Sequence, residues 1–248
     1  MSEEQHAFVL HARPHKENQL LVTLLTELNG KINALIYVGQ SKKSTKKGLL
    51  QPFLPLSISY KGDSSLKFIT RIESTSPSYS LRKNYLFSGF YLNELLVKLL
   101  SNDIDCSELF HQYKKALVQL DNQEDLNIVL RNFELFLISE LGMSFDFTPI
   151  HEEHTLFTDE NGEDYKEKAK GFYYIAEQGF VPAYSNHSSH CYNREHLEAI
   201  EKFIISTDEH ELGDAKLTFK LLMRQLLNQL LGNKPLNSRA LFKVRKPS

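Results

Sequence analysis

The sequence predicts an α+β protein in which a small β-barrel precedes a mostly α-helical domain. Short segments rich in β-branched and aromatic residues occupy the N-terminal part of the 248-residue chain. Beyond them the apolar residues recur about every 3.6 positions instead of about every two, which is typical of amphipathic helices. A Ser-rich segment with Pro77, at residues 74–80, separates the two patterns. We therefore expect a barrel domain over residues 1–80 and a helical domain over residues 81–248.

The N-terminal part contains five segments with the composition of strands. Asn29-Gly30, between the second and third, is the dipeptide that a two-residue hairpin turn favours, because both central positions need positive φ. Five strands without a long crossover helix favour an antiparallel barrel of the OB-fold type, with an SH3-like barrel as the alternative. The predicted strands cover residues 7–10, 19–28, 31–38, 54–60 and 66–72.

The C-terminal part contains three apolar stripes at helical spacing, over residues 92–100, 126–141 and 219–231. The second stripe ends at Gly142 and the third at Gly232, and glycine is the usual residue just past a helix end. Two further helices are predicted at residues 108–120 and 194–205. Over residues 143–192 the periodicity is lost and aromatic residues are scattered among glycine and charge, which predicts an irregular or short-stranded insertion.

Charge is strongly segregated along the chain, although the net charge is only −2. Residues 1–83 carry 12 Lys and Arg against 6 Asp and Glu, residues 84–215 carry 9 against 25, and residues 216–248 carry 8 against none. Two basic ends predict contacts with a polyanion such as DNA, whereas the acidic middle suits protein partners. Without a signal peptide, a long apolar span or a disulfide framework, we expect a cytoplasmic protein.

A lysine-rich loop at residues 39–48 is the main candidate for contacts with DNA phosphates. It resembles a phosphate-binding P-loop, but it lacks a glycine directly before Lys-Ser/Thr and is followed by Pro52 instead of a helix. Nucleotide hydrolysis is therefore not expected. Tyr37, Tyr60 and Phe68 are the candidates for base stacking. Tyr60, at a strand end beside Lys61, is the better surface candidate, whereas Tyr37 is expected in the core.

Two His-x-x-His pairs raise the question of a metal site. His151 with His154, and His187 with His190, have the spacing of a zinc knuckle with imidazoles in place of thiolates. Structural zinc sites favour cysteine ligands, so we expect no metal and no cofactor. One alternative function is a metal-dependent nuclease or hydrolase using the histidine and acidic cluster at 151–190, and another is a purely protein-binding scaffold.

Distinctive motifs follow one another along nearly the whole chain, at residues 7–14, 41–56, 88–96, 108–110, 130–135, 141–142 and 232–242. In this order they resemble the bacterial RecO family of recombination mediators. The resemblance implies an OB-fold, a helical domain with a zinc-finger-like insertion, and a non-enzymatic role in DNA repair through the RecF pathway. It also implies binding of single- and double-stranded DNA, strand annealing, contacts with RecR and with the C-terminal tail of the single-strand DNA-binding protein (SSB), and indirect loading of RecA.

Many family members carry four cysteines as a zinc module where this chain has its histidine pairs, and the missing thiolates favour a metal-free insertion. Arg131, with Leu130 and Phe133, is the candidate site for the acidic SSB tail, and local pairing with Glu134 is the alternative. A location on the nucleoid is also expected. The candidate DNA-binding residues are Arg13, Lys42, Lys43, Lys46, Lys47, Tyr60, Lys234, Arg239 and Lys243.

Overall fold

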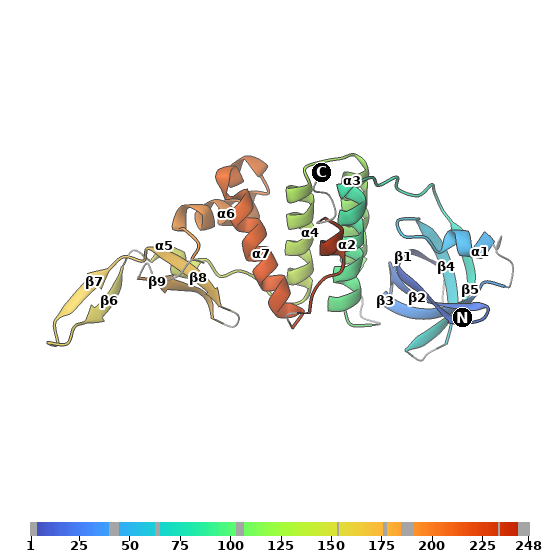
Figure 1. Ribbon diagram of the computed structural model, residues 1–248, viewed down its shortest axis with the longest axis horizontal. Helices are drawn as coiled ribbons and strands as arrows, with labels where there is room; N and C mark the ends of the chain where they lie inside the picture. Colours follow the sequence, from blue (N-terminus) through green and yellow to red (C-terminus); the bar gives the residue numbers. More distant parts are fainter. Residues whose placement is uncertain are drawn as a thin grey trace. The chain divides into compact units, whose positions relative to one another are not determined.

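The computed structural model describes most of the chain and divides it into two compact units (Figure 1). The first unit comprises residues 1–141 and 234–248, and the second comprises residues 142–233. The compact units therefore divide the chain after residue 141, whereas the sequence pattern places the boundary at residue 80. Among the described residues, no helix is long and apolar enough to cross a membrane. These residues are 4–39, 45–62, 65–102, 107–152, 154–175, 178–184, 191–232 and 234–242.

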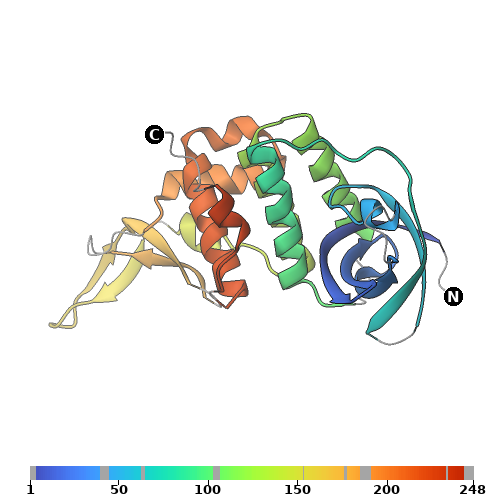
Figure 2. The ribbon, with the colours of Figure 1, turned by 45° about the vertical axis from the view of Figure 1, so that its right-hand side comes forward.

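The N-terminal strands form a closed five-stranded barrel, as the sequence predicts (Figure 2). Its strands follow the order β1-β2-β3-β5-β4, and helix α1 (Thr45–Leu49) lies between β3 and β4 in the chain. Its strand pairs are antiparallel except for one, because β3 pairs with β5 in parallel. Strand directions cannot alternate throughout a closed ring with an odd number of strands. The strands are β1 (Gln5–Lys16), β2 (Gln19–Thr26), β3 (Gly30–Tyr37), β4 (Leu56–Lys61) and β5 (Leu66–Ser74).

The barrel core follows from the two-residue period of its strands. Val22 and Leu24 on β2, and Ile32, Ala34 and Ile36 on β3, point inward and are almost completely buried. The residues between them point outward, because successive side chains of a strand lie on opposite faces of the sheet. The interior is therefore filled by apolar side chains, and any ligand of the barrel binds on its outer surface.

Helices α2 (Asn84–Leu99), α3 (Ser107–Asp121) and α4 (Leu126–Glu140) lie side by side in the first unit (Figure 1). Helix α2 contacts β1, and α3 contacts β2 and β3. Phe8 on β1 is only 1% exposed although it lies outside the barrel core. The Phe8 ring lies 5.3 Å from the ring of Tyr113 and 5.5 Å from that of Phe110 on α3. Asn93 on α2 donates a hydrogen bond of 3.2 Å to the carbonyl of Leu10. These contacts explain why the helices and the barrel form one compact unit.

The C-terminal segment around Asn237 and Ser238 is bound to the first unit by hydrogen bonds to Glu94 of α2. Its carboxylate accepts hydrogen bonds from the backbone N–H of Asn237 at 2.9 Å and of Ser238 at 2.8 Å, and pairs with Lys98 at 2.9 Å. Burial on its own raises the pKa of Glu94, but the hydrogen bonds from Ser238, Lys98 and Asn237 outweigh burial and lower that pKa to about 2. Glu94 thus holds the start of the short helix α8 (Ser238–Leu241) against α2.

The described residues of the second unit include two pairs of short antiparallel strands and two longer helices. Short strands therefore make up part of the insertion that the sequence predicts at residues 143–192. The hairpin β8–β9 packs through aromatic rings, with Phe180 lying 5.2 Å from both Tyr174 and Phe147. The elements of this unit are α5 (Thr148–His151), β6 (Thr155–Thr158), β7 (Asp164–Glu167), β8 (Gly171–Ile175), β9 (Gly179–Ala183), α6 (Arg194–Ser206), the 3₁₀ segment η1 (Glu209–Ala215) and α7 (Lys216–Leu230).

Gly89 on α2 allows this helix to pack closely against Phe53, which precedes β4, and Leu81, which follows β5. A Cβ atom at this position would lie 2.7 Å from Cδ1 of Leu81 and 2.8 Å from Cε1 of Phe53. We therefore expect Gly89→Ala to lower the free energy of unfolding by about 1–3 kcal/mol through overpacking, despite the higher helix propensity of alanine. Urea denaturation measures the change.

The matched control for this prediction is Gly48→Ala in α1, where a Cβ atom meets nothing within 4 Å. This change should leave the stability unaltered or raise it slightly, because alanine favours a helix more than glycine does. A Gly89→Ala protein as stable as the Gly48→Ala protein would contradict the packing described for α2.

Candidate nucleic-acid interface

Strand pairing places five residues in one row across the outer surface of the barrel, with Leu35 buried in the middle of the row. Arg13 lies opposite Leu21, Leu21 opposite Leu35, Leu35 opposite Phe68, and Phe68 opposite Lys61. Residues directly opposite one another point to the same face of a sheet. Phe68 is 45% exposed, and Arg13 and Lys61 are exposed at the two ends of the row.

A second row lies beside the first and adds another aromatic ring. Lys16 lies opposite Gln19, and Gln19 lies opposite Tyr37, whose side chain is 58% exposed. We call the surface formed by both rows the outer barrel face. It combines two exposed aromatic rings with three cationic side chains. The face consists of Arg13, Lys16, Gln19, Leu21, Leu35, Tyr37, Lys61 and Phe68.

The predicted roles of Tyr37 and Tyr60 are reversed in the structure. Tyr60 is only 7% exposed, belongs to the barrel core and donates a hydrogen bond of 2.7 Å from its hydroxyl to Oδ1 of Asn29. The expectation that Tyr60 offers a surface for base stacking is therefore wrong. On β4 it has the same parity as the inward-pointing Leu56 and Ile58, whereas Tyr37 follows the outward parity of its strand.

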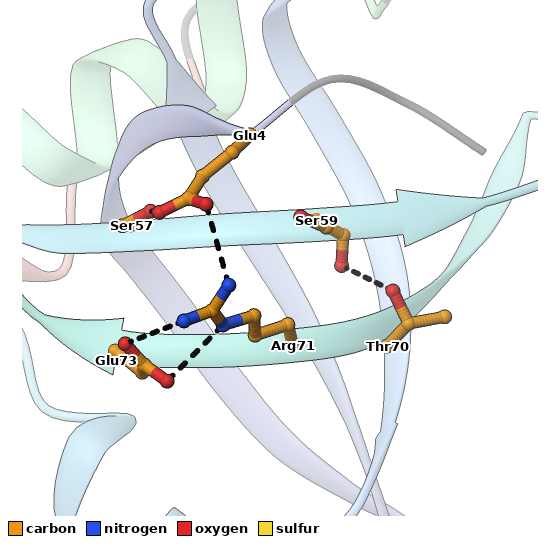
Figure 3. A network of polar contacts seen from close by, with 6 residues as sticks. All are labelled: Glu4, Ser57, Ser59, Thr70, Arg71 and Glu73. Atoms are coloured by element: carbon orange, nitrogen blue, oxygen red, sulfur yellow. Dashed lines mark hydrogen bonds and ion pairs between the residues drawn. The ribbon is translucent and has the colours of Figure 1, made fainter.

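Figure 3 shows Arg71 of β5 between Glu4 and Glu73. Arg71 pairs with Glu73 at 3.1 Å and with Glu4 at 3.5 Å, and Glu4 also accepts a hydrogen bond of 2.5 Å from Ser57. The hydrogen bond and charge of Glu73, followed by the charge of Glu4, raise the pKa of Arg71. Two carboxylates thus compensate this cation, whereas none of the residues in the two rows of the outer barrel face is acidic.

The other candidate cations lie in different surroundings. Lys46 and Lys47 are exposed on α1, and Lys234 is exposed before α8. The guanidinium of Arg239 stacks on the ring of Tyr91 at 5.9 Å, so this side chain lies against α2. The remaining candidates, Lys42, Lys43 and Lys243, lie outside the described residues.

Arg131, Leu130 and Phe133 do not form the open peptide site that the sequence suggests. Arg131 is 6% exposed and pairs with Glu134, which also accepts a hydrogen bond of 2.7 Å from the hydroxyl of Tyr91. Phe133 is buried in the core, and Leu130 is half-buried. The expectation of an exposed Arg131 is therefore wrong, and its local pairing with Glu134 takes place in the interior.

The histidine pairs are only partly described. Nε2 of His151 lies 2.6 Å from a carboxylate oxygen of Glu201 on α6, and His154 is exposed. His187 and His190 lie outside the described residues. In the part of the chain that the structure describes, no group of three or more His, Cys, Asp or Glu residues could hold a metal ion.

The opposite orientations of the two tyrosines predict opposite effects on stability. We expect Tyr60→Ala to lower the free energy of unfolding by about 3 kcal/mol or more, because it empties part of the core. Tyr37→Ala should change it by no more than about 0.5 kcal/mol, as is usual for an exposed residue. Urea denaturation of both proteins measures this difference, and equal losses would contradict the described orientation of β3.

Matches to known protein families cover nearly the whole chain. The family model described as "Recombination protein O N terminal" matches residues 1–78, and the model described as "Recombination protein O C terminal" matches residues 84–240. The DNA repair protein RecO of Cellvibrio japonicus is 36% identical over 247 residues, which is 98% of each chain. The DNA repair protein RecO of Tolumonas auensis is 37% identical over 237 residues, covering 95% of this chain and 93% of the relative. The chain therefore belongs to the RecO family.

Proposed function

We propose that this protein is a non-enzymatic DNA repair and recombination mediator that binds single-stranded DNA on the outer barrel face. The observation that carries the proposal is the placement of exposed Tyr37 and Phe68 in registered rows with Arg13, Lys16 and Lys61. Aromatic rings stack on the bases of single strands, and cations beside them neutralise phosphates. OB-folds bind oligonucleotides on the face of their second and third strands, to which Leu21, Leu35 and Tyr37 belong.

Strand annealing follows from the same chemistry. Two complementary strands repel each other, so a protein that neutralises phosphates on both and holds them close promotes their pairing. The outer barrel face binds one strand in this proposal. The exposed cations Lys46, Lys47 and Lys234 are candidates for contacts with the second strand or with duplex DNA.

Family membership supports a wider set of proposed partners: RecR, the C-terminal tail of SSB and, indirectly, RecA. Binding of the SSB tail by Arg131 would require the buried pair of Arg131 with Glu134 to separate first. The acidic middle of the chain is better suited to contacts with protein partners than to contacts with DNA. A place on the nucleoid in the cytoplasm is part of the same proposal.

Removing the aromatic rings should weaken single-strand binding without unfolding the protein. Stacking contributes about 1–3 kcal/mol per base, so we expect Tyr37→Ala and Phe68→Ala each to weaken binding roughly fivefold or more. Fluorescence anisotropy of a labelled oligonucleotide measures the affinity. Tyr165→Ala is the control, because Tyr165 is also exposed but lies on β7 of the second unit. Equal affinities of all three variants and the unmodified protein would contradict the proposal.

Removing the cations should change the salt dependence of binding. For single strands the slope of log K against log salt changes by about 0.7 per phosphate contact, so the triple variant Arg13→Ala, Lys16→Ala, Lys61→Ala should lose about 2 units of slope. Arg71→Ala is the matched control, because Glu73 and Glu4 already compensate this arginine. If Arg71→Ala reduced the slope as much as the triple variant, the phosphate contacts would not lie on the outer barrel face.

A further inference from the structure

A recess of about 420 Å³ opens on the barrel beside the row that runs from Arg13 to Lys61. Its base is a third row of paired residues, in which His11 lies opposite Thr23, Thr23 opposite Asn33, and Asn33 opposite Leu66. Each of these residues lies two positions from a member of the row that runs from Arg13 to Lys61, on the same strand. Residues two positions apart on a strand point to the same face, so the side chains of both rows point outward. The recess is therefore continuous with the outer barrel face.

The wall of the recess is the C-terminal end of α2, including Val97 and the following Asn102. This wall is fastened to β3, because Nζ of Lys31 donates a hydrogen bond of 2.9 Å to the carbonyl of Val97. A backbone bridge joins Lys31 to Asn102 as well. The recess is thus lined by residues of four strands, β1, β2, β3 and β5, and by the end of α2.

The polar groups at the base of the recess form a neighbouring donor and acceptor. The hydroxyl of Thr23 donates to Oδ1 of Asn33 at 2.9 Å. This arrangement leaves the Nδ2 group of Asn33 as a donor and the lone pairs of the Thr23 hydroxyl as acceptors. Apolar side chains of Leu21, Leu66 and Val97 line the same recess.

We propose that this recess receives one unpaired nucleobase of the bound strand, with Asn33 and Thr23 hydrogen-bonding to its Watson–Crick edge. This inference rests on the proposed function and adds a preference for single strands over duplexes. A base has apolar faces and an edge on which donors and acceptors alternate, which matches the lining and the polar pair. In a duplex the same edge is engaged by the complementary base, so the recess discriminates against double-stranded DNA.

The test compares three probes of equal length: a single-stranded oligonucleotide, its duplex and a single strand of abasic sites. Thr23→Val keeps the β-branched shape of the residue but removes the hydroxyl, and Asn33→Ala removes the amide. A base contact of this kind contributes a discrimination of roughly fivefold or more, so both variants should lose at least that much affinity for the single strand. Their affinities for the duplex and the abasic strand should stay within about twofold of the unmodified protein, since the recess then holds no base edge.

Thr70→Val is the matched control, because Thr70 also lies on the barrel but donates its hydrogen bond to the carbonyl of Ser59 away from the recess (Figure 3). Thermal unfolding of each variant verifies that the barrel remains folded. Equal losses for all three probes, or no loss for the single strand, would overturn the inference while leaving DNA binding intact. If the unmodified protein bound none of the probes, the proposed function itself would fail.

Discussion

The packing of helices α2 and α3 against the outer surface of the barrel is the interaction on which the proposed site depends. Phe8 is buried against Tyr113 and Phe110, and Asn93 both accepts from the Tyr113 hydroxyl at 2.6 Å and donates to the carbonyl of Leu10. The strand residues that these helices bury are thereby lost as a binding surface. Tyr37 and Phe68 remain exposed, and the end of α2 supplies the wall of the recess.

Much of the fold can be predicted from the sequence, because hydrophobic periodicity reports directly on burial. The same periodicity predicts that Tyr60 points inward, because it lies two positions after the inward-pointing Ile58. The apolar neighbours of Tyr37 predict a core position, but Tyr37 has the parity of Leu35, which is buried outside the barrel core. The odd number of strands in the closed ring requires a parallel pair, and the structure identifies it as β3 with β5. Strand register, in contrast, joins residues as distant as Arg13 and Phe68 and requires the folded barrel.

Charge counting predicts the basic character of the chain ends but not which cations are compensated. Arg71 and Arg13 are both exposed on the same barrel, and only the pairing of Arg71 with Glu73 and Glu4 distinguishes their surroundings. Arg131 is neutralised in the interior by Glu134, three residues away. Glu94 holds the segment around Asn237 and Ser238 on α2, so this last part of the C-terminal basic end belongs to the same compact unit as the barrel. Residues 216–233 of that basic end belong to the second unit.

The central claim is that single-stranded DNA lies across the outer barrel face, and photocrosslinking tests it most directly. An oligonucleotide containing a photoreactive base can be irradiated with the full-length protein, and the crosslinked residues can be located by mass spectrometry. The account predicts crosslinks at Tyr37 and Phe68, whose exposed rings stack on bases. Crosslinks confined to the surface around Arg71, or to residues 142–233 of the second unit, would contradict it.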